Sequence, residues 1–121
     1  MNASDDAAAR AAEASRVGLI LIGPGIEIEF VNAAAETLLG RSRRKLVGGL
    51  LDEAGPVGAA AAALARRAID EAREVFAHEI SVTGPGGQPD LRLSVDAVPE
   101  GRGACISLRA WPESGARPQS A

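Results

Sequence analysis

The most informative segment of the chain reads IEIEFVNAAAETLLGRSRRKLVG and spans residues 26–48. Its first residues alternate between apolar and acidic side chains, which predicts a half-buried strand over 26–31. Asn32 follows, and its side chain can accept a hydrogen bond from the free N–H groups at the start of a helix. We therefore expect a helix over 33–39 that ends at Gly40, because glycine adopts the left-handed closing conformation readily.

The residues before this segment predict a second strand and an N-terminal helix. Residues 17–23 form a short apolar run, and the following Pro24-Gly25 pair marks a turn, so the two strands form a hairpin. The run is apolar on both of its faces and therefore needs cover on both sides of a sheet. The alanine-rich residues 1–16 predict a helix that is stable only when it packs against something.

The residues after the segment predict a long helix and three more strands. An apolar stripe indicates a helix over 58–74, and on its far side Arg66 and Asp70 are spaced four apart, as are Arg67 and Glu71. The period-two alternations that predict strands cover residues 76–82, 91–97 and 104–108. We expect one domain over 17–110 and a disordered tail or linker over 111–121.

Composition excludes several classes of protein. The chain has 121 residues, which fits one domain, and is 46% hydrophobic but only 2% aromatic, so its core is aliphatic. With one His and one Cys, it cannot build a zinc finger or a disulfide framework alone. The net charge of −3 argues against nucleic-acid binding. No targeting signal or membrane-length apolar run is present, so we expect a cytoplasmic protein that does not bind a membrane.

The segment 26–48 resembles the PAS domain family. The resemblance is carried by Asn32 after the second strand, then by Ala34-Ala35, Leu38-Leu39-Gly40 and Leu46-Val47-Gly48. Within the family, the chain is most similar to the N-terminal PAS domain of nitrogen-regulation sensor histidine kinases, the NtrB type. The resemblance implies an α+β fold with a five-stranded antiparallel sheet of order 2-1-5-4-3, helices on one face and an N-terminal flanking helix.

The resemblance also implies a function. A PAS module of this type would be the sensory and dimerising part of a cytoplasmic two-component histidine kinase, with no catalytic activity and no cofactor of its own. Its implied partners are a second copy of the chain, the kinase core of a longer chain, a response regulator and a PII-type protein. The competing hypothesis is a PAS receptor domain that binds a small metabolite or cofactor in the cavity between sheet and helices.

Each hypothesis has its candidate residues. If the uncovered face of the sheet forms a homodimer, the interface is expected at Ala8, Ala12, Val17, Leu19 and Leu21. The N-terminal helix of the same chain could cover that face instead. If a ligand occupies the cavity, its lining is expected from Ile28, Phe30, Leu38, Leu64, Ile69 and Ile106.

Other motifs suggest chemistry that their context does not support. His78 in AHEIS resembles a histidine-kinase phosphoacceptor box, but its neighbours alternate with the period of a strand rather than a helix. Cys105 lacks the surrounding motif of flavin-binding PAS domains, so we interpret it as structural. Ser94, Asp96 and His78 lack the strained nucleophile turn of a hydrolase. The Gly-rich loop 84–88 joins two strands and carries no phosphate-binding Lys. We expect no catalytic site and no metal site.

Overall fold

The computed structural model describes residues 17–84 and 91–110. The expected helix over 1–16 and the tail over 111–121 lie outside the described residues. The elements, in chain order, are strands β1 (Gly18–Ile22) and β2 (Ile28–Val31), helices α2 (Ala33–Leu39) and α3 (Arg43–Leu46), the 3-10 turn η1 (Leu51–Glu53), helix α4 (Gly55–Glu71), and strands β3 (Val75–Val82), β4 (Leu91–Glu100) and β5 (Gly103–Ala110).

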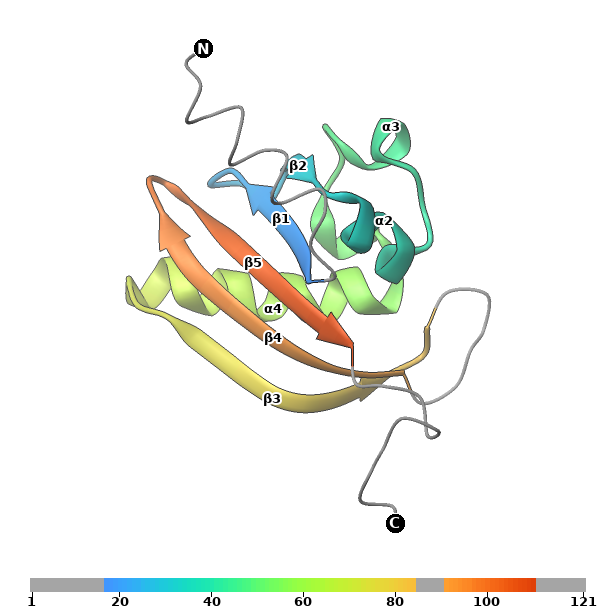
Figure 1. Ribbon diagram of the computed structural model, residues 1–121. Coiled ribbons are helices and arrows are strands. Elements are labelled where there is room, and N and C mark those ends of the chain that lie inside the picture. The colour runs from blue at the N-terminus through green and yellow to red at the C-terminus, as the bar shows by residue number, and fades with distance from the viewer. Residues whose placement is uncertain (1–16, 85–90, 111–121) are drawn as a thin grey trace, which may run out of the picture.

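The strands form one antiparallel sheet with the helices on one of its faces (Figure 1). Within the described part of the chain the strand order is β2-β1-β5-β4-β3. Helix α4 crosses behind β5, β4 and β3, while α2 lies beside β1 and α3 beside β2 (Figure 1). The predicted antiparallel α+β architecture of PAS type is therefore confirmed.

Asn32 fixes the hairpin to the first helix, as the sequence predicted for its capping role. Its side chain is fully buried, and its Oδ1 accepts hydrogen bonds from the backbone N–H groups of Ala35 and Leu19, each at 2.9 Å. Its Nδ2 donates to the carbonyl of Val17 at 2.9 Å. One side chain thus caps α2 and holds the start of β1, which is why this short segment specifies so much of the fold.

The core between the sheet and α4 is aliphatic, and small residues on the helix close it. The inner face of the sheet supplies branched side chains such as Ile20, Ile106 and Leu108, all buried completely. Helix α4 presents alanines to them, and four of these are also completely buried: Ala61, Ala62, Ala65 and Ala68. Because an alanine side chain is a single methyl group, the helix lies close against the sheet.

The boundaries of α4 differ from the prediction of 58–74. The helix begins three residues earlier, at Gly55, with Pro56 in its first turn, where the missing N–H of proline costs nothing. It ends at Glu71, because Ala72 adopts a left-handed conformation with φ of 55°. The sequence gives no sign that the helix ends here, because alanine is the best helix former and an alanine at position 72 predicts that the helix continues.

Two strands carry irregularities that reverse the predicted faces. In β2, the register shifts so that Ile28 lies opposite Ile22 whereas Phe30 lies opposite Leu21, on the other face. In β3, the register shifts between Ala77 and Ile80, so Phe76 is 56% exposed although Ile80 packs against the core. The predicted alternations placed Ile28 with Phe30 and Phe76 with Ile80, and both pairings are wrong, because an extra residue in a strand exchanges its faces.

Candidate functional site

The face of the sheet opposite α4, here called the outer face, carries a row of apolar side chains. Leu21 of β1 lies opposite Phe30 on one side and Cys105 of β5 on the other, and Cys105 lies opposite Val98 of β4. Leu21 is 37% exposed and Val98 is 38% exposed. The row therefore crosses four neighbouring strands without an ionisable carboxylate, ammonium or guanidinium group.

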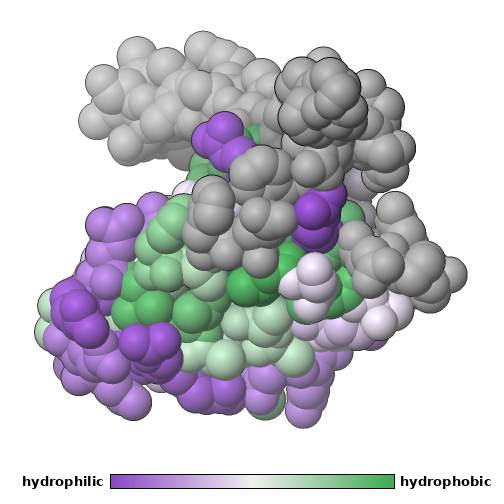
Figure 2. Space-filling model, turned by 90° about the horizontal axis from the view of Figure 1, so that it is seen from below, coloured by the Kyte–Doolittle hydropathy of each residue, from purple (hydrophilic) through white to green (hydrophobic). Residues whose placement is uncertain are grey.

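Apolar side chains at the β3 edge belong to the opposite, core-facing side of the sheet, because Ile80 lies opposite the buried Leu93 and Val82 lies opposite Leu91. Ile80, Val82 and Leu91 are partly buried and pack against the core from this edge. Figure 2, which looks at the molecule from below, shows hydrophobic side chains gathered in the middle of that side, with hydrophilic ones along its left and lower border. On the outer face, the row formed by Leu21 and its paired neighbours is contiguous, and contiguous apolar surface marks interaction sites on soluble proteins more often than isolated exposed residues do.

A shallow hollow at one end of the outer face is polar. It has a volume of about 200 Å³ and is lined by Val17, Phe76, Ser94, Asp96, Ser107 and Arg109. Val17 and Arg109 are the neighbours of Gly18 and Leu108, which pair with each other. The segments before residue 17 and after residue 110 therefore both join the described fold at this hollow.

Asp96, which lines the hollow, raises the pKa of a neighbouring carboxyl group and of a nearby thiol. A hydrogen bond to Asp96 raises the pKa of Glu74, and the negative charge of Asp96 adds to this effect. Burial raises the pKa of the Cys105 thiol, with further contributions from Glu100 and Asp96. The thiol is thus kept protonated and weakly nucleophilic, which supports the structural interpretation of Cys105.

The Glu74–Asp96 pair predicts a pH-dependent stability. When the folded-state pKa of a carboxyl is raised above its unfolded value, the folded protein binds more protons, so stability falls as pH rises through that window. We expect Glu74→Gln to raise the melting temperature at pH 7, and the gain to vanish below about pH 4. Calorimetry across this pH range measures the difference.

Glu71→Gln is the matched control for this prediction. A hydrogen bond from Arg73 lowers the pKa of Glu71, so its removal is expected to lower the melting temperature at pH 7. Opposite shifts for the two glutamates at neutral pH support the assignment. An equal loss of stability in both variants at pH 7 would contradict it.

Four of the six predicted pocket residues lie at the core between the sheet and the helices. Ile28 and Ile106 are buried in it, and Leu38 and Leu64 are partly buried against it. Phe30 lies on the outer face, with the Arg43 guanidinium 5.7 Å from its ring centroid. Ile69 lines a hollow between the β1–β2 turn and α4.

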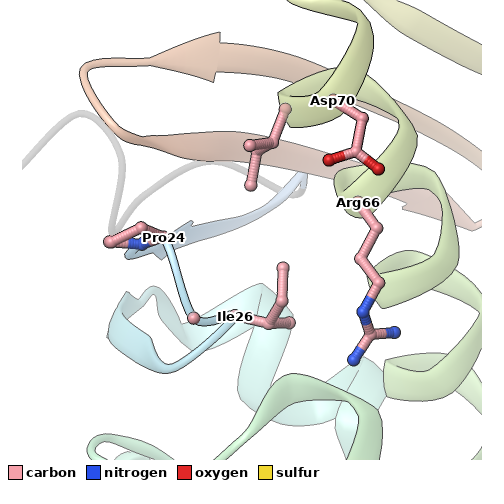
Figure 3. Close-up of a pocket in the computed structure, with 6 residues that line it drawn as sticks. Pro24, Ile26, Arg66 and Asp70 are labelled. Atoms are coloured by element: carbon pink, nitrogen blue, oxygen red, sulfur yellow. The ribbon is translucent and has the colours of Figure 1, made fainter.

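This second hollow was missed by sequence reasoning (Figure 3). It has a volume of about 310 Å³ and lies between the β1–β2 turn and α4, lined by Pro24, Gly25, Ile26, Arg66, Ile69 and Asp70. The sequence does mark the turn and both charged residues. What it lacks is any signal that the turn lies against this part of the helix.

The predicted dimer residues within the described chain share one face. Leu19 and Leu21 lie on the outer face, and Val17 lines its polar end. Ala8 and Ala12 lie outside the described residues. The positions suit an interface, and dimerisation itself stays a prediction.

Three further expectations concern the element that holds His78, metal sites and membrane-spanning segments. His78 lies in strand β3, as predicted, and not in a helix. Across residues 17–84 and 91–110, no three His, Cys, Asp or Glu side chains are grouped in a way that could hold a metal ion. None of the helices described is long and apolar enough to cross a membrane.

Three solved structures have a similar fold. The PAS domain of nitrogen regulation protein NR(II) from Vibrio parahaemolyticus matches with a TM-score of 0.64 and 16% identity, covering 86% of this chain and 97% of that one. A PAS domain from a two-component sensor histidine kinase matches with a TM-score of 0.66 and 12% identity, covering 89% and 96%. The PAS domain of the Cronobacter turicensis quorum-sensing receptor RpfR, in complex with BDSF, matches with a TM-score of 0.62 and 12% identity, covering 81% and 96%.

The sequence comparisons address the family directly. A comparison with curated protein sequences found no match. The family model for the PAS domain matches residues 9–75, which is more than half of the chain. Together with the fold, this match shows that the chain belongs to the PAS domain family.

Proposed function

We propose that the chain is the sensory and dimerising PAS module of a cytoplasmic two-component histidine kinase of the nitrogen-regulation type, without catalytic activity of its own. Two copies associate through the outer face of the sheet. The module then biases the segments that lead to the kinase core. A response regulator and a PII-type protein would be the partners of the whole kinase.

The apolar row on the outer face carries this proposal. β1 is an interior strand with apolar residues on both faces, and α2 and the core cover only the face that holds Ile20 and Ile22. Leu21 and its neighbours Phe30, Cys105 and Val98 need cover of another kind. A second copy provides it through a two-fold contact in which the same row meets itself, which is the commonest arrangement of homo-oligomers.

The polar hollow suits a signalling output. The segments on both sides of the described fold join it there, next to Asp96 and Arg109. A shift between the two copies would therefore act on both segments at once. The proposal locates the coupling to the kinase core at this end of the sheet.

The small residues that pack between the sheet and α4 favour the signalling hypothesis over the metabolite- or cofactor-receptor hypothesis. A ligand between the sheet and α4 would need the space that Ala61, Ala65 and Ala68 fill on the helix side and Ile106 fills on the sheet side. Each of these residues is completely buried. An absorption spectrum and native mass spectrometry of the purified chain provide a direct check, and a stoichiometric ligand would favour the receptor hypothesis.

Leu21→Arg is expected to weaken dimerisation strongly. The change places a charge in the centre of the apolar row, where it has no counter-charge when two rows meet, so the dimer should weaken by roughly tenfold or more. Light scattering coupled to size exclusion, on the full chain over a range of concentrations, measures the mass directly.

Val47→Arg is the matched control for this experiment. Val47 is 42% exposed, similar to Leu21, but lies after α3 and not on the sheet. The control variant should dimerise like the parent chain. A parent chain that remains monomeric at high concentration would refute the proposed dimer, and so would equal weakening by both variants.

A further inference from the structure

The hollow between the β1–β2 turn and α4 has the features of a small-molecule site. Its volume of about 310 Å³ is at the lower end of the range for ligand pockets. In Figure 3, Pro24 and Ile26 lie on one side, and Arg66 and Asp70 extend from α4 on the other. Ile69 of α4 also lines the hollow and adds an apolar side chain to it.

The two charged side chains that line this hollow, Arg66 and Asp70, do not pair with each other. Arg66 and Asp70 are spaced for an ion pair along the helix, but Arg66 Nη2 instead donates to Asp52 Oδ2 at 2.9 Å. One residue along the helix, the equivalent pair Arg67–Glu71 does form, at 3.6 Å. Among the described residues, the Asp70 carboxylate has no hydrogen bond or ion pair. The hollow therefore presents a carboxylate without a partner and a guanidinium with spare donors.

The turn that faces these charges is held in one conformation. Ile26 has φ of 67°, a left-handed conformation that a β-branched residue adopts rarely. It is kept there because its N–H donates to the Gly23 carbonyl at 3.0 Å and its own carbonyl accepts from Leu51 N–H at 3.0 Å. Its side chain is only 5% exposed. The apolar wall of the hollow is thus formed before any ligand arrives, which reduces the entropy cost of binding.

We propose that this hollow binds a free aliphatic α-amino acid. The ligand carboxylate pairs with the free N–H groups of Arg66, the ammonium group pairs with Asp70, and the branched side chain lies against Pro24, Ile26 and Ile69. A simple carboxylic acid would leave Asp70 without a partner and bring two carboxylates together. A simple amine would be repelled by Arg66. Only a zwitterion satisfies both charged groups.

NMR titration of the full chain tests the proposal. L-leucine, L-isoleucine and L-valine are each added to millimolar concentration, and amide shifts are followed by ¹⁵N correlation spectra. Shifts are expected at Gly25, Ile69 and Asp70, which line the hollow. Isovalerate and isopentylamine, which each carry one of the two charges on a similar carbon skeleton, should bind more weakly by roughly tenfold or more.

Variants connect the binding to the named charges. Asp70→Asn and Arg66→Gln should each weaken binding by roughly tenfold or more. Arg67→Gln, the same change one residue along α4, should leave binding unchanged. The proposal fails if none of the three amino acids shifts these amides, if isovalerate or isopentylamine binds as tightly, or if Arg67→Gln weakens binding as much as Arg66→Gln.

The proposed amino-acid site does not depend on the proposed dimer. The hollow lies on the helix side of the sheet, whereas Leu21 lies on the outer face. A monomeric chain that binds leucine would refute the dimer alone, and a dimer that binds no amino acid would refute the hollow alone.

Discussion

Replacing Asn32 with alanine is expected to lower the free energy of unfolding by about 3–5 kcal/mol, the largest effect of any polar substitution in the described fold. The variant leaves the N–H groups of Leu19 and Ala35 and the carbonyl of Val17 without their side-chain partner. The site is completely buried, so water cannot replace the lost hydrogen bonds without opening the structure. Chemical denaturation at a fixed protein concentration measures the loss.

Two further variants make this prediction specific. Thr37→Ala removes an exposed hydroxyl that donates to the Ala33 carbonyl at 3.2 Å, and its cost should stay within about 0.5 kcal/mol. Asn32→Asp keeps the two accepted hydrogen bonds but loses the donor to Val17 and buries a charge, so it should still be destabilising. A loss below about 1 kcal/mol for Asn32→Ala would show that Asn32 does not hold β1 to α2.

Gly103→Ala is expected to destabilise the fold by about 3 kcal/mol or more, because it creates a collision with the backbone that rotamer changes cannot relieve. A Cβ at Gly103 would lie 1.8 Å from the carbonyl oxygen of Ile22. The contact joins the start of β5 to the end of β1, so relief requires the two central strands to separate at this end. Thermal and chemical denaturation should both show the loss.

Gly49→Ala is the matched control for this close approach. A Cβ at Gly49 would lie 3.4 Å from the Leu46 carbonyl oxygen, an ordinary contact, so the cost should stay below about 1 kcal/mol. If Gly103→Ala were as stable as Gly49→Ala, the close packing of β5 against the end of β1 would be disproved.

The sequence predicted the hairpin, the capped helix and the strands β4 and β5 because their signals are local. Asn32 caps α2 through a residue three positions away, and the alternation in β4 and β5 is regular enough to assign each face. The inward positions of Leu93 and Val95 and of Ile106 and Leu108 are confirmed by their complete burial. Where neighbouring residues decide the structure, the pattern was sufficient.

The faces of Phe30 and Phe76 could not be predicted, because they depend on the partner strand. A register shift is decided by how two strands pair, and neither strand alone records it. Both aromatic residues consequently add to the outer face, for which the predicted interface had been Ala8, Ala12, Val17, Leu19 and Leu21. With these two aromatic side chains, the outer face is more apolar than the sequence suggested.

Sequence reasoning missed the amino-acid hollow for a similar reason. The spacing of Arg66 and Asp70 predicted an ordinary surface pair, and the competing partner Asp52 lies in the η1 turn, 14 residues earlier in the chain. Only the folded chain shows that Asp52 takes the guanidinium and that the β1–β2 turn lies opposite. Charge pairing on a helix surface is set by tertiary neighbours as much as by spacing.

The central claim, that two copies meet through the outer face, is tested most directly by an isotope-filtered NOE experiment. An equal mixture of ¹³C-labelled and unlabelled chains reports only contacts between different copies. The account predicts intermolecular NOEs to the methyl groups of Leu19, Leu21 and Val98. A spectrum in which intermolecular NOEs are absent, or arise from α4 residues such as Ile69 and not from the outer face, would contradict it.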